Sequence, residues 1–371
     1  MSIDEQPDND SSRERSAGFG TPDWWIYRGT GRPLPDVRLT DLLPAPPPWR
    51  DFRGGPLPER DAPPPDDGEA RRRLGAESHL SERDVDPHEV DMVNAALYLR
   101  RPLLVTGRPG TGKSSLAFRI ARELNLGRVL RWPITSRTTL KSGLYAYDAI
   151  GRAQAAATRQ ALARWGPDPD RPLPDAEPPV GDFVRLGPLG TAFLPTELPR
   201  VLLIDELDKS DVDLPNDLLS IFEDGQFTIP ELERVRDRSP EVSVLTDDPG
   251  ATATVVDGRV SCRAFPVVVI TSNGEREFPE AFLRRCLRLT IKEPDAEQLA
   301  AMVAAHLSGT DDEQRRRMIQ EFLDRGAEGG GLPADKLLDA LYLATSGTYR
   351  GDDESWARLR DALWRQLTPA T

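Results

Sequence analysis

Cysteine and histidine are both scarce in this sequence. There are two cysteines and three histidines among 371 residues. Cys262 and Cys286 lie outside any metal-ligand spacing, and His79, His88 and His306 are far apart. The scarcity argues against a disulfide framework and against a zinc site built from Cys and His. Because it is typical of a protein kept in a reducing compartment, we expect a cytoplasmic location.

Long hydrophobic runs and a surplus of positive charge are also missing. No apolar run reaches the roughly 18 residues that a membrane helix needs, and the acidic, polar start does not read as a signal peptide. The net charge is −13, from 48 Lys and Arg against 61 Asp and Glu. Contacts to phosphate backbones need clustered Lys and Arg. We therefore expect neither a membrane nor a nucleic acid as partner.

The first part of the chain has too few apolar residues, and too many prolines, to build a core. Residues 1–84 are rich in Pro, Asp, Gly and Arg without a sustained period, so we predict them to be mostly disordered or extended. The exception is PDWWIYRGTGRP at 22–33, whose WWIY run is costly to leave in water. It docks either on this protein's own core or on a partner, and the sequence leaves both open.

Residues 85–293 and 294–371 have different patterns. The first range alternates apolar runs of strand length with helical periods, which indicates an α/β core whose parallel sheet is covered on both faces. The second range has helical periods only, so we predict a separate small all-α domain. The expected core strands are 101–107, 127–135, 199–206 and 265–273.

The stretch GRPGTGKSS at 107–115 fits the pattern G-x-x-x-x-G-K-[ST], and it follows a predicted strand and opens a predicted helix. Its glycines let backbone N–H groups approach phosphate oxygens, and a helix N-terminus adds a positive end. A chance Gly-rich turn is the alternative. The pattern predicts that Lys113 reaches the β- and γ-phosphates of ATP and that Ser114 ligates Mg²⁺. The predicted nucleotide-binding residues are Gly107, Pro109, Gly110, Thr111, Gly112, Lys113, Ser114 and Ser115.

The stretch VLLIDELDKSD at 201–211 is an apolar strand that ends on two carboxylates, Asp205 and Glu206. Alone, it reads equally well as a buried strand that meets a solvated loop. Downstream of a phosphate loop, it predicts the second half of a nucleotide site. Asp205 would hold Mg²⁺, mostly through water, and Glu206 would activate the attacking water, since a carboxylate beside a divalent cation stays ionised.

The chain resembles an AAA+ ATPase in three stretches, which occur in this order: GRPGTGKS, VLLIDELDKSD and VVVITSNGEREFPEAFLRRC. Further stretches are similar to the MoxR branch of this family, which is of dynein-related type. They are GPLGTAF at 187–193, LPNDLLSIFEDGQFTIPE at 214–231 and FPEAFLRRC at 278–286. The resemblance covers about 85–295. It implies a three-layer αβα phosphate-loop core, and it implies that the helical end of the chain is a lid.

The resemblance also implies roles for polar residues. Asn273 matches sensor 1, which contacts the γ-phosphate or the lytic water; the alternative is an Asn that caps a strand end. Arg285 matches the arginine-finger position and Arg284 is a second candidate; the alternative is a solvated basic pair. Sensor 2 is the departure from the family pattern, because neither Arg325 nor Lys336 fits its position cleanly.

The function implied by the resemblance is an ATP-hydrolysing motor that assembles into a homo-oligomeric ring, with a hexamer expected. It would remodel or activate a client or adaptor protein, for which the family expectation is a von Willebrand A-domain protein. Two β-type runs in 225–265, FTIPEL and ATVVDGRVSC, lie around a polar loop. They match insertion hairpins that face the pore or client, or else they are plain surface loops. The alternatives are a nucleotide-dependent assembly switch in defence or signalling, and a GTP-specific restriction-type relative.

Overall fold

The structure is a computed structural model. It describes residues 22–34, 38–58, 64–66, 68–76, 85–165, 178–307, 312–329, 332–346 and 353–364. The disorder predicted for residues 1–21 lies outside the described residues. None of the helices in the described ranges combines the length and the hydropathy that are needed to span a bilayer.

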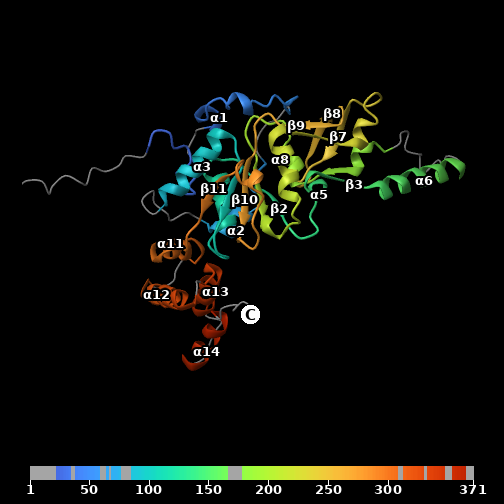
Figure 1. Ribbon diagram of the computed structural model, residues 1–371. Helices are drawn as coiled ribbons and strands as arrows, with labels where there is room; N and C mark the ends of the chain where they lie inside the picture. Colours follow the sequence, from blue (N-terminus) through green and yellow to red (C-terminus); the bar gives the residue numbers. More distant parts are fainter. Residues whose placement is uncertain are drawn as a thin grey trace, which may run out of the picture.

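The centre of the molecule is a five-stranded sheet in which every pairing is parallel (Figure 1). Its strand order is β11-β1-β10-β5-β2. Short runs of Val, Leu and Ile form these strands because the sheet buries both of its faces. The parallel α/β core predicted from the sequence is thus confirmed. The strands are β1 Leu103–Thr106, β2 Leu130–Pro133, β5 Val201–Asp205, β10 Val267–Ser272 and β11 Leu287–Thr290.

Alternate residues of these strands enter two different hydrophobic clusters. Ile204 and Ile270 face a cluster that includes residues of α7 and α8. Leu203 and Val269 face the opposite cluster, which includes residues of α3 and α4. The sheet is therefore the middle layer of three. The covering helices are α3 Pro87–Leu99, α4 Lys113–Glu123, α5 Leu140–Leu144, α7 Pro188–Ala192 and α8 Leu214–Asp224.

A second sheet of six strands, in the order β3-β4-β7-β8-β9-β6, packs on the α7 and α8 side. Phe227, Val244 and Val260 bury their side chains in the same cluster as that face of the first sheet, so this region is not plain surface loop. The sequence analysis missed β7, and Pro230 starts helix α9 inside a predicted strand. The elements are β3 Tyr145–Tyr147, β4 Val184–Leu186, β6 Gln226–Thr228, α9 Pro230–Glu233, β7 Glu241–Leu245, β8 Thr252–Val256 and β9 Arg259–Ser261.

The WWIY segment docks on the protein's own core. Ile26 and Tyr27 are buried. Their backbone N–H groups donate to Asn94 Oδ1 of α3 at 2.8 and 3.0 Å, and Asn94 Nδ2 donates to the Tyr27 carbonyl at 2.7 Å. Trp25 Nε1 donates to Asp91 Oδ1 at 2.8 Å. Asn94 and Asp91 of α3 together hold this segment on the core, which decides between the two docking alternatives.

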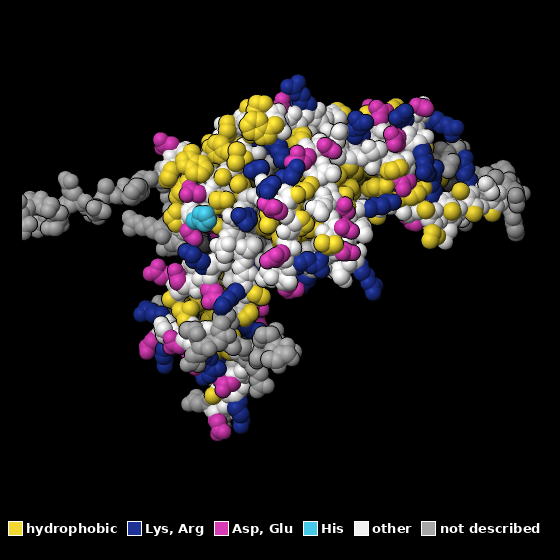
Figure 2. All heavy atoms as spheres, in the orientation of Figure 1, with side chains coloured by type: hydrophobic (Ala, Val, Ile, Leu, Met, Phe, Trp, Pro, Cys, Tyr) yellow, Lys and Arg dark blue, Asp and Glu magenta, His cyan; other side chains and the backbone are white. Residues whose placement is uncertain are grey.

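Residues 38–58 also pack on the core, so the prediction of disorder is wrong for them. They include α1 Leu39–Leu42 and the 3-10 turn Pro48–Arg50, and Arg50 is buried. The Gly54 N–H donates to the Cys262 carbonyl at 3.0 Å. These contacts are widely spaced along the chain and have no period, which is why the sequence does not show them. Hydrophobic side chains gather over this region (Figure 2), and Trp49 is 76% exposed.

The carboxy-terminal helices build a core of their own, below the sheet in Figure 1. They bury Leu299, Phe322, Leu337 and Trp364 together. The helical character predicted for this part is confirmed, and we call these helices the lid; the domain boundaries at 84 and 293 stay a prediction. The helices are α11 Ala296–His306, α12 Asp312–Gly329, α13 Ala334–Thr345 and α14 Asp353–Leu363.

Candidate functional site

Three central strands end side by side at the carboxyl edge of the parallel sheet. In the register, Thr106 of β1 pairs with Ser272 of β10, and Ile270 of β10 pairs with Ile204 of β5. The phosphate-loop motif follows β1, Asp205 ends β5 and Asn273 follows β10. Ligand sites of open α/β sheets lie at this edge. The register alone thus brings the three predicted motifs together.

The loop after β1 has a backbone that favours glycine. Gly110 and Gly112 have φ values of +79° and +84°, a region that other residues rarely adopt. Gly112 is the N-cap of α4, so the loop runs directly into a helix N-terminus. A Cβ on Gly107 would stand 2.6 Å from the carbonyl oxygen of Ile291. The loop therefore matches the phosphate cradle that the motif predicts.

Lys113 is the first residue of α4 and is buried. Its ammonium donates to the backbone carbonyls of Gly107 and Arg108 at 2.8 and 2.7 Å, so the side chain curls back over the loop. Burial lowers the pKa of Lys113, whereas the charges of Asp208 and Glu206 oppose that shift. The charge of Asp205 acts in the same direction, so three acidic side chains lie near this one ammonium.

The hydroxyl of Ser114 donates to Asp205 Oδ1 at 2.7 Å. The same oxygen accepts from Thr271 Oγ1 at 2.9 Å, and Asp205 Oδ2 accepts from Arg131 Nη2 at 3.2 Å. The residue from the phosphate-loop helix and the residue from the acidic strand are therefore in direct contact. A hydroxyl beside a carboxylate is a pair of hard oxygen ligands, which suits Mg²⁺.

Glu206 follows β5 in a left-handed conformation, with φ 62° and ψ 52°. Its backbone N–H donates to Thr271 Oγ1 at 2.8 Å, which turns the side chain toward Asn273. Asn273 Nδ2 donates to Glu206 Oε1 at 3.2 Å, and Lys209 Nζ donates to Oε2 at 2.7 Å. The hydrogen bond to Glu206 raises the pKa of Lys209. Unlike Asp205, Glu206 keeps 41% of its side chain exposed.

Asp208 is a site residue that the sequence analysis missed. It is buried, and its Oδ2 accepts from the backbone N–H groups of Asn273 and Glu275 at 2.9 and 3.1 Å. It therefore fixes the turn after β10 and so the placement of Asn273. The available signal was a further carboxylate in the run DELD at 205–208, because a buried acid at a strand end needs a partner.

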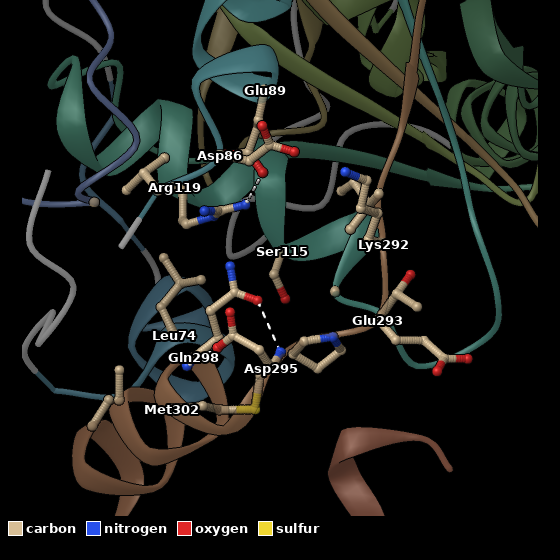
Figure 3. Close-up of a pocket in the computed structure, with 18 of the residues that line it drawn as sticks. Leu74, Asp86, Glu89, Ser115, Arg119, Lys292, Glu293, Asp295, Gln298 and Met302 are labelled. Atoms are coloured by element: carbon tan, nitrogen blue, oxygen red, sulfur yellow. Dashed lines mark hydrogen bonds and ion pairs between the residues drawn. The ribbon is translucent and has the colours of Figure 1, made fainter. Parts of the chain in front are cut away.

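A cavity of about 470 Å³ adjoins the loop. Thr111, Gly112 and Ser115 line it from the phosphate-loop side, and Met302 lines it from lid helix α11. In the view of Figure 3, Leu74 and Arg119 lie on one side, Lys292 and Glu293 on the opposite side, and Ser115 between them. The cavity has the volume of a small-ligand site, and it lies where the core, the lid and the amino-terminal segment meet.

The remaining predicted loop residues lie around this cradle. Thr111 Oγ1 donates to the Arg108 carbonyl at 2.9 Å, and Pro109 is exposed at the tip of the loop. A Cβ on Gly110 would stand 2.4 Å from Cβ of Pro333, the N-cap of α13. The lid thus touches the phosphate loop through Pro333.

Arg325 and Lys336, the doubtful sensor-2 positions, both belong to the lid. Arg325 pairs with Asp361 of α14 at 2.6 Å, and its guanidinium stacks over Trp364. These contacts hold α12 to α14 and do not reach the phosphate loop. Lys336 lies in the first turn of α13, after Pro333.

The structure does not bring Arg284 and Arg285 to the other predicted site residues. They precede β11, at the amino edge of the sheet, whereas the phosphate loop follows the parallel strand β1. Four residues of strand separate the two edges, which is roughly 13 Å. Arg285 Nε donates to Glu223 Oε1 of α8 at 2.7 Å, and Arg284 pairs with Glu280.

One comparison with known proteins agrees with this geometry. Residues 102–286 match the family described as AAA domain (dynein-related subfamily), so this part of the chain is an AAA+ domain. A search of curated proteins finds no match. The solved structure of the RuvB Holliday junction branch migration motor of Thermotoga maritima is similar to the chain, with 15% identity and a TM-score of 0.37; the match covers 78% of this chain and 73% of that chain. The family match supports nucleotide binding and NTPase activity in general.

Proposed function

We propose that this AAA+ chain is a Mg²⁺-dependent ATPase of MoxR-like type, which assembles into a ring and remodels or activates a partner protein. One observation carries the ATPase assignment. Ser114 contacts Asp205 at 2.7 Å, beside Lys113, and Glu206 contacts Asn273 at 3.2 Å at the same sheet edge. A cation, a pair of hard oxygen ligands and a carboxylate held by an amide are the parts that phosphoryl transfer to water requires.

The backbone of the loop from Gly107 to Ser115 binds the phosphates. Lys113 exchanges its contacts with the Gly107 and Arg108 carbonyls for oxygens of the β- and γ-phosphates, because a charge-assisted hydrogen bond is stronger than one to a neutral carbonyl. Ser114 and Asp205 hold Mg²⁺, which neutralises charge on the phosphate oxygens when it is bound. Arg131 contacts the other carboxylate oxygen of Asp205 at 3.2 Å.

Glu206 is the general base of the reaction. It accepts a proton from a water, whose oxygen forms a bond to the γ-phosphorus as the bond to the bridging β–γ oxygen breaks. Asn273 orients the carboxylate and the water, and Asp208 positions Asn273 through its backbone N–H. Lys209 pairs with the other carboxylate oxygen of Glu206.

Arg285 acts on the site of a neighbouring subunit. It lies at the opposite edge of the sheet from its own phosphate loop, so it cannot reach that site in the same chain. A ring places the finger face of one subunit against the nucleotide of the next, and AAA+ domains commonly assemble in this way. The hexameric state and a von Willebrand A-domain client rest on the MoxR resemblance alone.

The test is a steady-state phosphate-release assay with ATP or GTP in the presence and absence of Mg²⁺. We expect Mg²⁺-dependent turnover that ATP supports better than GTP, and it should rise with protein concentration as rings assemble. Preferential GTP turnover would favour the restriction-type alternative. Nucleotide binding and assembly without any turnover, also with candidate clients, would favour an assembly switch.

A further inference from the structure

A short helix of the proline-rich segment packs between the core and the lid. Helix α2, Glu69–Leu74, belongs to the stretch that the sequence predicts to be disordered. Ala70 is buried, and α2 packs against α4, the helix that follows the phosphate loop. The guanidinium of Arg73 lies 4.9 Å from the ring centroid of Phe118 on α4. This end of the segment is therefore part of the folded structure.

The two residues after α2 join the core to the lid. Arg122 Nη2 of α4 donates to the Gly75 carbonyl at 3.1 Å, and the Ala76 N–H donates to the Ala305 carbonyl of lid helix α11 at 3.2 Å. Gly75 has φ 81° and ψ 177°, a combination that is essentially restricted to glycine. A Cβ at Gly75 would stand 2.3 Å from the Ala305 oxygen. The close approach to the lid requires glycine here.

The same helix forms one wall of the cavity beside the phosphate loop. Arg73 and Leu74 line it together with Ser115 of α4 and Met302 of α11. In Figure 3, Leu74 and Met302 both lie in the lower left of the view. Two apolar side chains from different elements offer a flat ring a surface on which to pack.

We propose that Arg73 and Leu74 of α2, together with Gly75 and Ala76, form a nucleotide clamp. Leu74 and Arg73 hold the nucleoside end of the bound nucleotide, and the Gly75–Ala76 link keeps the lid closed over the cavity. The proposal rests on the nucleotide-binding function proposed above. The clamp takes the place of a sensor-2 side chain in connecting the lid to the core, because Arg325 forms its ion pair with Asp361 inside the lid. Release of nucleotide then requires the link from Ala76 to Ala305 to break.

The experiment compares Gly75→Ala with Gly68→Ala by displacement of a fluorescent ATP analogue. Gly68 lies at the other end of α2 and also has positive φ, +86°, but a Cβ there meets nothing within 4 Å. We expect Gly75→Ala to release the analogue roughly tenfold faster than wild type, since it loses a hydrogen bond and a close lid contact. Gly68→Ala should stay within about threefold of wild type.

A second pair keeps the test decisive if Gly75→Ala fails to fold. Arg72 and Arg73 both pair with Glu69, but Arg72 is 72% exposed whereas Arg73 packs on Phe118 and lines the cavity. Arg73→Ala should speed release roughly threefold to tenfold, and Arg72→Ala should not change it. Hydrogen exchange of 68–76 and α11 should slow together when the analogue binds.

The outcomes separate the clamp from the function on which it rests. If wild type binds the analogue and both Gly75→Ala and Arg73→Ala release it at the wild-type rate, the clamp is wrong and the nucleotide site stands. If wild type binds neither ATP nor GTP, the proposed function fails and the clamp fails with it.

Discussion

The two edges of the five-stranded sheet hold their polar side chains in different ways. At the carboxyl edge, Asp205 and Asp208 are buried, and each accepts two or more hydrogen bonds. At the amino edge, Arg284 and Arg285 keep 72% and 41% of their side chains exposed. The two buried acids at the carboxyl edge are fixed by neighbours of their own chain. Groups exposed on the far edge are available to another molecule, and the variants below test this difference.

The largest expected effect on ATP binding is at the carboxyl edge, where Lys113→Ala should weaken it by about a hundredfold or more. The substitution removes charge-assisted contacts to two phosphates, each of which contributes about 1.5–3 kcal/mol. Isothermal titration with ATP and Mg²⁺ measures the change. Lys141→Ala is the matched control, because this lysine is 64% exposed and pairs only loosely, at 3.8 Å, with Glu231. Equal affinities for the two variants would remove Lys113 from the site.

Glu206→Gln should keep ATP affinity within about threefold and lower turnover by a factor on the order of 10² to 10⁴, the usual contribution of a general base. The amide preserves the hydrogen bond with Asn273 but cannot take a proton from water. Binding and steady-state hydrolysis are measured on the same preparation. Glu277→Gln, which changes an exposed carboxylate in the segment after β10, serves as control. Wild-type turnover in Glu206→Gln would contradict its assignment as base.

Arg285→Ala should bind ATP normally and hydrolyse it roughly tenfold or more slowly. Well-studied arginine fingers contribute a factor of roughly 10³–10⁵ to the hydrolysis rate. We expect a smaller loss here because the adjacent Arg284 can replace Arg285 in part. Mixed with Lys113→Ala, it should recover part of the activity at concentrations that support assembly. Recovery requires an interface at which the intact phosphate loop of one subunit faces the intact arginine finger of its neighbour.

Arg284→Ala is the control for this experiment, and its turnover should stay within about threefold of wild type, since it pairs only with Glu280 one helical turn away. If Arg284→Ala is the slower variant, the finger is Arg284. If mixed rings form and recover nothing, the action between subunits is wrong.

The smallest expected effect is that of Glu223→Gln, which should lower turnover about twofold to fivefold without changing ATP affinity. Glu223 accepts from Arg285 Nε at 2.7 Å and lies 3.8 Å from Arg50. An ion pair that is nearly half exposed contributes at most about 1 kcal/mol. The concentration dependence of hydrolysis checks that assembly is intact. A loss as large as that of Arg285→Ala would mean that Glu223 itself belongs to the interface.

The sequence alone was sufficient to predict the parallel core and to identify the motifs that follow its strands. Phosphate loops and acidic strand ends depend on local backbone geometry, so the glycines, Lys113 and the Asp205–Glu206 pair can be read from spacing. Parallel strands bring such motifs together without further information, because their carboxyl ends share one edge. Asp208 escaped notice because its partners are backbone N–H groups of a distant turn.

Tertiary structure decided the rest, for one physical reason. Asn94 binds the WWIY segment, Gly54 contacts Cys262, and Gly75 lies between α4 and α11. In each case the contacting residues are far apart in sequence. Such contacts give no periodic signal, since the docked chain takes its shape from the surface beneath it rather than from its own pattern. The sequence identified Arg285 as a finger by motif, and the direction of the parallel strands places it at the edge of the sheet opposite its own phosphate loop.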